Sequence, residues 1–402
     1  MNSFKVATLI SAALLAACST AGPTAGVVYR GQAFDPDTVA TGREWIVAMA
    51  GAQPEGQDGA TLGARRPLGG GLWLVRTRTP GRPVLEGVAW MERNARERLA
   101  PEQGWRGPGW LDETGAGGAQ WGFERIRTRQ AGQATRGVQA VRVAVVDSGI
   151  DASHPDLLGR LVPGIDLVDG DGDPFDQNAH GTHVAGIIGA TTDDGLGLSG
   201  VAPGAMLMPV RVMDAQGEGT VATVCEGIIK AADMGADVLN LSIGSRAGAL
   251  AKQAAIDHAL AKGAVVVAAM GNSGSFQAIY PAANHGVMAV GATRQGDALA
   301  DYSNYGVWMT IVAPGTGIIS TLPRGRWWPL SGTSMAAPHV SGVAALVRSL
   351  RPGLSPPAVA ALLRAGAEDM GPPGPDERHG AGQLNAAATL AALGSEMAAG
   401  QP

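Results

Sequence analysis

The stretch VRVAVVDSG at residues 141–149 decides the fold of this chain. Its apolar run is rich in valine and stops at Asp147, which is followed by Ser148 and Gly149. A short and nearly continuous apolar run predicts a strand that is buried on both faces, as in a parallel sheet. Because ligands of parallel α/β sheets bind beyond the carboxyl ends of the strands, the place where this run stops is a candidate functional position.

Further runs of the same kind recur downstream and alternate with Ala-rich segments of helical length and spacing. The runs are MLMPVRVMD (206–214), ADVLNLSIG (236–244), AVVVAAMGN (264–272) and VMAVGAT (287–293). The helical segments between them include AGIIGA, VCEGIIKAADM and LAKQAAIDHALAKG. This alternation predicts an α/β fold with a mostly parallel central sheet that is flanked by helices.

Side chains with complementary chemistry stand at these strand ends and at predicted helix starts. Asp147 and Asn272 each follow an apolar run, His180 opens HGTHVAG, and Ser334 lies in GTSMAAPHVSG. A lone Asp or Ser at such a place is more often a cap than a catalyst. Together they form the set that acyl transfer needs: a hydroxyl nucleophile, an imidazole base and a carboxylate that orients the base.

The residues around Ser334 fit a nucleophile at the start of a helix. Gly332 leaves room for a substrate backbone to approach, because it has no Cβ. If the helix begins at Met335, Pro338 falls among the first four helical residues, whose N–H groups are unpaired in any case. The free amides of the helix start would then face a developing oxyanion.

The three motifs VAVVDSGID, HGTHVAG and GTSMAAPHVSG together resemble the subtilisin-like serine proteases, and the order Asp, His, Ser is that of this family. The resemblance covers about residues 118–395 and implies a three-layer catalytic domain over residues 120–395. It implies that Asp147, His180 and Ser334 form a catalytic triad and that Asn272 is the side-chain donor of the oxyanion hole.

The same resemblance implies the substrate-binding residues. Ser242, Ile243 and Gly244 stand where the family pairs the substrate backbone as an added strand. Gly271 matches a wall of the pocket for the residue before the scissile bond, called P1. Ile279 stands where relatives with broad pockets carry Gly, so we expect a narrow pocket that favours small or medium side chains.

Acidic residues give two candidate calcium sites. Asp156 matches the calcium-binding Asp of the family, and Thr191–Ser199 occupies the position of the calcium ligand loop. A second group lies in DLVDGDGDPFD, where Asp166, Asp169 and Asp171 offer the hard oxygen ligands that Ca²⁺ prefers. The alternative for this second group is a solvated acidic loop.

Two other residues invite a chemical role. His183 lies three residues after His180, but HGTH lacks the Glu of a zincin motif and no third ligand is apparent, so we expect His183 to pack in the helix. Cys225 has no evident partner, and we expect a small buried residue.

The N-terminus carries an export signal. Residues 1–17 combine Lys5 with an apolar stretch too short to span a bilayer, and Leu15-Ala16-Ala17-Cys18 resembles a bacterial lipobox. We therefore expect an exported protein with a lipid on Cys18, anchored in the outer membrane on its periplasmic or surface face. The alternative is a plain signal peptide and a secreted enzyme.

Residues 24–95 contain three β-like runs, at 44–49, 72–77 and 88–91, and resemble the small α+β inhibitory prodomain of the family. Residues 96–119 are polar and glycine-rich, which predicts a linker that contains the maturation site. The alternative is an accessory domain that stays attached to the enzyme.

Composition limits the remaining choices. The net charge of −5 gives no reason to expect a nucleic-acid partner, and two Cys exclude a disulfide-stapled scaffold. With the family resemblance and the N-terminal signal, the expectation is a monomeric, exported serine endopeptidase that acts on proteins or peptides and meets the membrane only through its lipid anchor. The alternatives are an inactive, surface-anchored binding module and a processing protease of narrow specificity.

Overall fold

The computed structural model describes residues 43–49, 62–78, 80, 82–83, 85, 87–99, 103–104, 120–192 and 198–399. The strands are β1 (Glu44–Met49), β2 (Leu62–Gly69), β3 (Leu72–Thr77), β4 (Val88–Arg93), β5 (Arg96–Arg98), β6 (Gln103–Gly104), β7 (Arg142–Asp147), β8 (Ile165–Asp166), β9 (Met206–Arg211), β10 (Glu218–Thr220), β11 (Val238–Leu241), β12 (Val265–Ala269), β13 (Met288–Arg294), β14 (Ala298–Leu299), β15 (Met309–Pro314), β16 (Ile318–Leu322) and β17 (Arg326–Ser331). The helices are α3 (Trp121–Arg125), α4 (Thr128–Ala131), η1 (Pro155–Leu157, a 3-10 helix), α5 (His180–Gly189), α6 (Val221–Asp233), α7 (Ala249–Ala261), α8 (Thr333–Leu350), α9 (Pro356–Ala365) and α10 (Ala386–Ala399).

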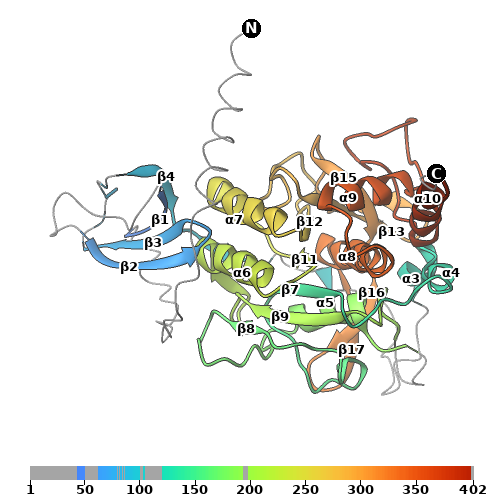
Figure 1. Ribbon diagram of the computed structural model, residues 1–402, viewed down its shortest axis with the longest axis horizontal. Coiled ribbons are helices and arrows are strands. Elements are labelled where there is room, and N and C mark those ends of the chain that lie inside the picture. Colours follow the sequence, from blue (N-terminus) through green and yellow to red (C-terminus); the bar gives the residue numbers. More distant parts are fainter. Residues whose placement is uncertain are drawn as a thin grey trace, which may run out of the picture.

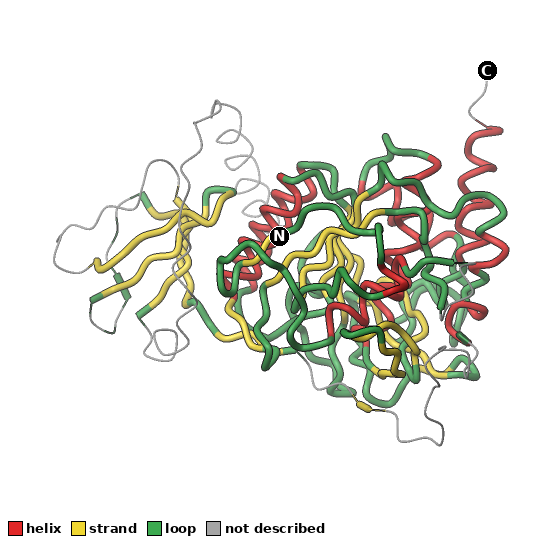
Figure 2. The backbone as a smooth tube through the Cα atoms, turned by 90° about the horizontal axis from the view of Figure 1, so that it is seen from below, coloured by secondary structure: helices red, strands yellow, loops and turns green. Residues whose placement is uncertain are grey.

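The central sheet has eight strands, with β14, β13, β12, β11, β7, β9 and β8 in spatial order and β15 also paired to β13. All five apolar runs predicted from the sequence form adjacent, parallel strands of this sheet, β13, β12, β11, β7 and β9. The short β14 pairs antiparallel to β13. Figure 2 shows these strands stacked side by side in the interior of residues 120–395, which are called the catalytic part after the sequence prediction. The predicted α/β class is confirmed.

The two faces of the central sheet are covered by different helices, which gives three layers (Figure 1). Alternate residues of β7 point to opposite sides: Val143 and Val145 pack with α5, α8, α9 and α10, whereas Ala144 and Val146 pack with α6 and α7. Because the strands are covered on both sides, they read as continuous apolar runs in the sequence. Among the described residues no helix is long and apolar enough to cross a membrane.

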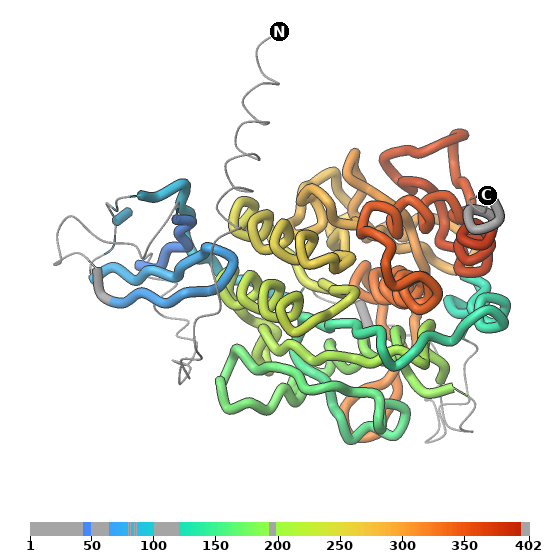
Figure 3. The backbone as a smooth tube through the Cα atoms, in the orientation of Figure 1, coloured from blue at the N-terminus to red at the C-terminus, as the bar shows by residue number. Residues whose placement is uncertain are grey.

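A separate antiparallel sheet precedes the catalytic part, with the strand order β2, β3, β1, β4. It packs on the outer side of α6 and α7, as Figure 3 shows for the blue segment of the chain, and its Ile46, Leu68 and Leu72 belong to the same core cluster as residues of those helices. The three predicted β-like runs are β1, β3 and β4, whereas β2 was not anticipated. The helix of an α+β segment is not among the described residues.

The predicted linker, residues 96–119, is more ordered in its described part than its composition indicates. Residues 96–98 form β5, which pairs with β10, and residues 103–104 form β6, which pairs with β17. Both partner strands belong to the catalytic part. Polar and glycine-rich residues can form such strands because the pairing uses backbone groups and requires no apolar pattern.

Candidate active site

Asp147 and His180 are joined by a short hydrogen bond at the carboxyl edge of the sheet. Asp147 is the last residue of β7, and His180 is the first residue of α5. The Oδ1 atom of Asp147 lies 2.7 Å from Nδ1 of His180, and both side chains are buried. A carboxylate at Nδ1 holds the ring in place and favours the tautomer in which Nε2 is the basic nitrogen.

Asp176 fixes the Asp147–His180 pair in position through hydrogen bonds to residues close to both. Its carboxylate accepts hydrogen bonds from five groups, namely Ser148 Oγ, Asn178 N, Ala179 N, Thr182 N and Thr182 Oγ1. The Ser148 hydroxyl in turn accepts from the Gly181 amide. Asp176 therefore caps the start of α5 and ties it to the residue after Asp147. Burial raises the pKa of the Asp176 carboxyl, and these hydrogen bonds act in the opposite direction.

Ser334 is the second residue of α8 and is 1% exposed in the full-length chain. Its Oγ donates to the carbonyl oxygen of Ser242 at 3.2 Å, and the Ser242 Oγ donates to the Ser334 carbonyl at 2.9 Å. Helix α5, which begins at His180, packs against α8. Ser334 therefore lies at the start of a helix, as the sequence predicts.

The predicted place of Pro338 within α8 is wrong. The helix begins at Thr333 and not at Met335, so Pro338 is its sixth residue, beyond the first turn. A proline there has no N–H for the carbonyl four residues earlier, which is that of Ser334. The Ser242 hydroxyl supplies the missing donor.

Asn272 lies beside the start of α8, and the oxygen of its side-chain amide is hydrogen-bonded there. Its Oδ1 accepts from the backbone amide of Thr333 at 2.9 Å and from Thr333 Oγ1 at 2.8 Å. Its Nδ2 is buried and has no hydrogen-bond partner among the described residues. A buried donor without a partner costs free energy unless a ligand fills the place in front of it.

Two of the predicted substrate-binding residues, Gly244 and Gly271, lie against the side chain of a third, Ile279. Ser242 and Ile243 follow β11, and Gly244 comes next. A Cβ on Gly244 would lie 2.6 Å from Ile279 Cγ2, and a Cβ on Gly271 would lie 3.1 Å from Ile279 Cγ1. Ile279 therefore lies between the two glycines that the sequence assigns to the substrate site.

The glycines next to the candidate catalytic residues are required by the protein's own backbone. Gly149 has a φ of +108°, and a Cβ there would lie 2.4 Å from the Pro174 carbonyl oxygen. A Cβ on Gly181 would lie 2.1 Å from the Gly149 carbonyl oxygen. These positions allow β7 and α5 to approach closely enough for the Asp147–His180 hydrogen bond.

Two stretches of the N-terminal segment pair with the catalytic part. The first is β5, which is antiparallel to β10 and is followed by the Leu99 amide, which donates to the Gly217 carbonyl at 2.9 Å. In the second, Gln103 pairs with Ser331, three residues before Ser334. Residues 100–102 lie outside the described residues, and the chain on either side of them is bound to the catalytic part as an added strand.

The acidic cluster contains a resident cation of its own. Carboxylate oxygens of Asp166, Asp169 and Asp171 lie within 4.8 Å of one another, which is close enough to hold a metal ion. However, Arg211 Nη1 lies 2.6 Å from Asp169 Oδ2 and 3.3 Å from Asp166 Oδ2, and its side chain is 2% exposed. Because the guanidinium already occupies oxygens of two of the three carboxylates and offsets part of their charge, the cluster is a poor fit for calcium.

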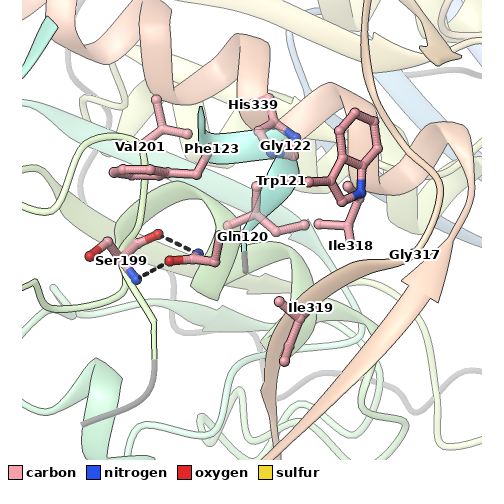
Figure 4. Close-up of a pocket in the computed structure, with 11 residues that line it drawn as sticks. Gln120, Trp121, Gly122, Phe123, Ser199, Val201, Gly317, Ile318, Ile319 and His339 are labelled. Atoms are coloured by element: carbon pink, nitrogen blue, oxygen red, sulfur yellow. Dashed lines mark hydrogen bonds between the residues drawn. The ribbon is translucent and has the colours of Figure 1, made fainter. Parts of the chain in front are cut away.

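The surroundings of Asp156 are only partly described. Its carboxylate is buried and accepts from the Trp327 indole at 2.7 Å, and its carbonyl accepts from the Thr191 amide. The other end of the predicted ligand loop is held by Gln120, whose side chain forms two hydrogen bonds with the backbone of Ser199. Figure 4 shows Gln120 reaching toward Ser199 at a pocket that also contains Trp121 and Phe123. Residues 193–197 of this loop lie outside the described residues.

His183 and Cys225 are both buried packing residues, as the sequence predicts. The Nε2 atom of His183 lies 2.9 Å from the Trp328 carbonyl oxygen, and burial lowers the pKa of the ring to about 3. Burial also raises the pKa of the Cys225 thiol. Cys18, the predicted lipidation site, lies outside the described residues.

Sequence reasoning missed two contributors to this site. Asp176 ends the acidic stretch DLVDGDGDPFD, and nothing in the sequence distinguishes it from its acidic neighbours, although it is buried against α5. Ser242 is predicted to pair with the substrate backbone, and its side chain has a further role, the hydrogen bond to the Ser334 carbonyl. The one signal that could have revealed the second role is Pro338, because a proline inside a helix leaves a carbonyl in need of a donor.

Comparison with known proteins shows which family the chain is similar to. The model of the subtilase family matches residues 139–382. A thermophilic serine proteinase from Bacillus sp. (strain AK1) is 47% identical over 232 residues, which is 58% of each chain. Thermitase from Thermoactinomyces vulgaris is 45% identical over 57% of this chain and 82% of its own length.

A third relative, subtilisin Savinase from Lederbergia lenta, is 40% identical over 268 residues, or 67% of this chain and 97% of its own length. The family match covers more than half of the chain, and it includes the strand that ends in Asp147 and the helix that carries Ser334. The chain belongs to the subtilase family of serine peptidases.

Proposed function

We propose that this protein is an endopeptidase in which Ser334 is the nucleophile, His180 the general base and Asp147 the residue that orients the base. Ser334 Oγ attacks the substrate carbonyl carbon while His180 takes the hydroxyl proton, and His180 then returns that proton to the leaving amine. The acyl-enzyme is hydrolysed by water in the same manner. Asn272 Nδ2 and the Ser334 amide stabilise the negative oxygen of each tetrahedral intermediate.

The observation that carries this proposal is the buried Nδ2 of Asn272, which has no partner among the described residues. The Oδ1 atom of the same side chain is held by Thr333, the residue before Ser334. The amide is thereby fixed with a spare donor beside the nucleophile. A donor that is held in place before charge develops is what transition-state stabilisation requires.

Hydrolysis of casein and of fluorogenic peptides tests this function. The wild-type protein should cleave peptide bonds, and the Ser334→Ala variant should not. An inactive binding module would leave both substrates intact. A processing protease of narrow specificity would cleave one surface protein and leave casein undigested, so broad casein digestion counts against that alternative.

We also propose that the N-terminal sheet is an inhibitory prodomain that the enzyme releases itself. Two of its side chains cap helices of the catalytic part: Asn94 Oδ1 accepts from the Ala222 amide of α6, and Glu92 Oε1 accepts from the Ala251 amide of α7. These contacts satisfy backbone donors that helix starts leave unpaired. Because Leu99 and Gln103 are each bound to the catalytic part by backbone groups, with Gln103 paired to Ser331 close to Ser334, we place the cleaved bond between them.

Self-cleavage is tested by the size of the purified protein. The wild type should be shortened to a chain that begins within residues 100–103, while Ser334→Ala should keep its N-terminal sheet. Equal sizes for the two proteins would favour an accessory domain that stays attached.

The P1 pocket is proposed to accept small or medium side chains, because Ile279 lies between Gly244 and Gly271. A peptide library should therefore give a P1 profile rich in residues such as Ala and Val. The Ile279→Gly variant should accept large aromatic P1 residues better than wild type does. A wild-type profile dominated by aromatic residues would contradict the proposal.

Calcium binding stays a proposal that comes from the family resemblance. We place it at Asp156, where a bound ion would stabilise the fold and take no part in the reaction, and not at the cluster that Arg211 occupies. EDTA should lower the melting temperature of the wild type and of Asp166→Asn, and should leave that of Asp156→Asn unchanged. A wild-type melting temperature that does not respond to EDTA would contradict a structural calcium ion.

Export and lipidation of Cys18 are proposed from the sequence of the first 18 residues alone. The lipid would anchor the precursor, and self-cleavage between Leu99 and Gln103 would free the enzyme from it. Membrane fractionation should find Ser334→Ala with the membranes and the mature wild-type enzyme in the soluble fraction. A soluble Ser334→Ala protein would favour a plain signal peptide.

A further inference from the structure

Lys252 is a buried cation in an unfavourable place. It lies in the first turn of α7, and its side chain is 0% exposed. A positive charge near a helix N-terminus is destabilised by the helix dipole, and a buried ammonium loses its hydration. The neighbouring core residues, among them Ile243 and Ile256, are apolar. Packing alone therefore gives no reason for a lysine at this position.

The partner of Lys252 comes from the N-terminal segment. Lys252 Nζ lies 2.5 Å from Glu97 Oε1, and the Glu97 side chain is also 0% exposed. Ser245 Oγ donates to the same carboxylate oxygen at 2.8 Å. Lys252 Nζ also donates to the Tyr280 carbonyl at 2.9 Å. Glu97 is thus held in a pocket whose charged end is Lys252 and whose other polar groups belong to the catalytic part.

Glu97 reaches this pocket from a strand that is paired to the catalytic part through its backbone. It is the middle residue of β5, opposite Gly219 of β10, and Gln103 farther along the same segment pairs with Ser331. Ser245 follows directly on Ser242–Gly244, the stretch assigned to the substrate backbone. This step rests on the proposed function, because it takes residues 96–104 to lie along the path of a peptide substrate.

Release of the N-terminal segment leaves the charge of Lys252 unbalanced. Among residues 120–192 and 198–399, no carboxylate forms an ion pair with Lys252, whose remaining contacts are the Tyr280 carbonyl and the Ser245 hydroxyl. An incoming carboxylate would restore the buried pair, and a neutral or cationic side chain would not. A pocket of this kind strongly favours a substrate with a carboxylate over one with a neutral or cationic side chain, since an unmatched buried charge is costly.

We propose that Lys252 is a specificity-determining residue that selects a glutamate side chain in the substrate, at the position that Glu97 holds in the precursor. With the cleaved bond between Leu99 and Gln103, this position is the third to the sixth residue before the bond. The preferred substrates are then proteins with an acidic residue upstream of a small P1 residue.

Peptides with the chain's own sequence around Glu97 test this proposal, because they keep residue 97 at the same distance from the cleaved bond as in the precursor. Mature wild-type enzyme is given a peptide of residues 94–106 with Glu97 kept or replaced by Gln, Leu or Lys. Each peptide is measured as a substrate where it is cut and as a competitive inhibitor of fluorogenic-peptide hydrolysis where it is not. We expect the glutamate peptide to exceed the glutamine peptide at least tenfold in kcat/KM or in affinity.

The matched enzyme variant is Lys252→Met, with Lys252→Arg as the variant that keeps the charge. Lys252→Met should lose the glutamate preference, and Lys252→Arg should retain it. Because Lys252→Met would bury Glu97 without its partner in the precursor and could block folding, it is also made together with Glu97→Met. Self-cleavage removes residue 97, so both routes give the same mature enzyme.

Three outcomes are distinct. A glutamate preference that Lys252→Met abolishes supports the proposal. An active enzyme that shows no such preference, or that keeps it in Lys252→Met, overturns the assignment of Lys252 and leaves the endopeptidase function intact. A wild-type protein that hydrolyses neither casein nor any peptide overturns the proposed function, and this inference with it.

Discussion

The Ser242 hydroxyl donates a hydrogen bond to the carbonyl oxygen of Ser334, at 2.9 Å, from a strand end 92 residues away. Pro338 explains why it is needed, because a proline at that position leaves the Ser334 carbonyl without its helical donor. The hydroxyl also accepts from Asn240 Nδ2 at 2.9 Å, so a second hydrogen bond fixes its position. The backbone of the candidate nucleophile is thereby held by the strand that is proposed to bind the substrate.

Removal of this hydroxyl should destabilise the start of α8. Ser242→Ala should lower the free energy of unfolding by about 1–3 kcal/mol, because it leaves a buried carbonyl without a donor. Urea denaturation measures this loss. The double variant Ser242→Ala/Pro338→Ala should recover part of it, since the alanine that replaces Pro338 provides an N–H for the Ser334 carbonyl. Strictly additive effects in this cycle would show that the two positions are not coupled.

Loss of the Asn272 amide should affect turnover more than binding. In a subtilisin, loss of the side-chain oxyanion donor costs about 10²–10³ in kcat, and we expect the same range for Asn272→Leu with KM changed little. Thr333→Val removes the hydroxyl contact to Asn272 Oδ1 but keeps the Nδ2 donor, and is the matched control. Steady-state kinetics on one peptide compares the three enzymes. Equal losses in both variants would assign Asn272 a structural role.

Asp176 should matter for activity although it does not touch substrate. Asp176→Asn turns one acceptor into a donor that faces N–H groups of the α5 start, so His180 should move and kcat/KM should fall at least tenfold. Asp173→Asn is the control, because Asp173 is an exposed residue of the same loop. The pH–rate profile separates positioning from loss of folded protein: only a displaced His180 shifts the acidic limb, which reports the pKa of the general base. Unchanged kinetics below the melting temperature would refute the role given to Asp176.

Acid should destabilise the protein through its buried histidines. The pKa of His183 is lowered to about 3 by burial, while in the unfolded chain it is close to 6.5. The folded pKa is the lower one, so the stabilising contribution is present above about pH 6.5 and is lost as the pH falls toward 3. Within that window each pH unit costs up to about 1.4 kcal/mol per histidine. His183→Gln should flatten the plot of unfolding free energy against pH between about pH 4 and 6.

Much of the fold follows from short stretches of sequence. The valine-rich run that ends in Asp147 is almost entirely apolar because helices cover both of its faces, and this pattern predicts a buried parallel strand. The same holds for the other four runs. The strand ends then place Asp147, Ser242 and Asn272 at one edge of the sheet. The positions of these residues could therefore be predicted from apolar pattern and motif order alone.

Contacts between distant polar residues could not be predicted in this way. Glu97 and Lys252 are 155 residues apart, and each stands in a segment whose pattern resembles that of a solvated surface. Asp176 looks like its acidic neighbours, and only the fold shows that it turns inward while Asp173 faces solvent. Strands β5 and β6 are held by backbone pairing, which leaves no periodic trace in the side chains.

The central claim, that Ser334 is an activated nucleophile, is tested most directly by a fluorophosphonate probe followed by peptide mapping. The reagent phosphonylates a serine only where a base and an oxyanion hole activate it. We predict one adduct, on Ser334 of the mature enzyme, which His180→Ala and Asp147→Ala weaken severely and Ser334→Ala abolishes. An adduct on another residue, or none in a protein that is folded and mature, would contradict the account.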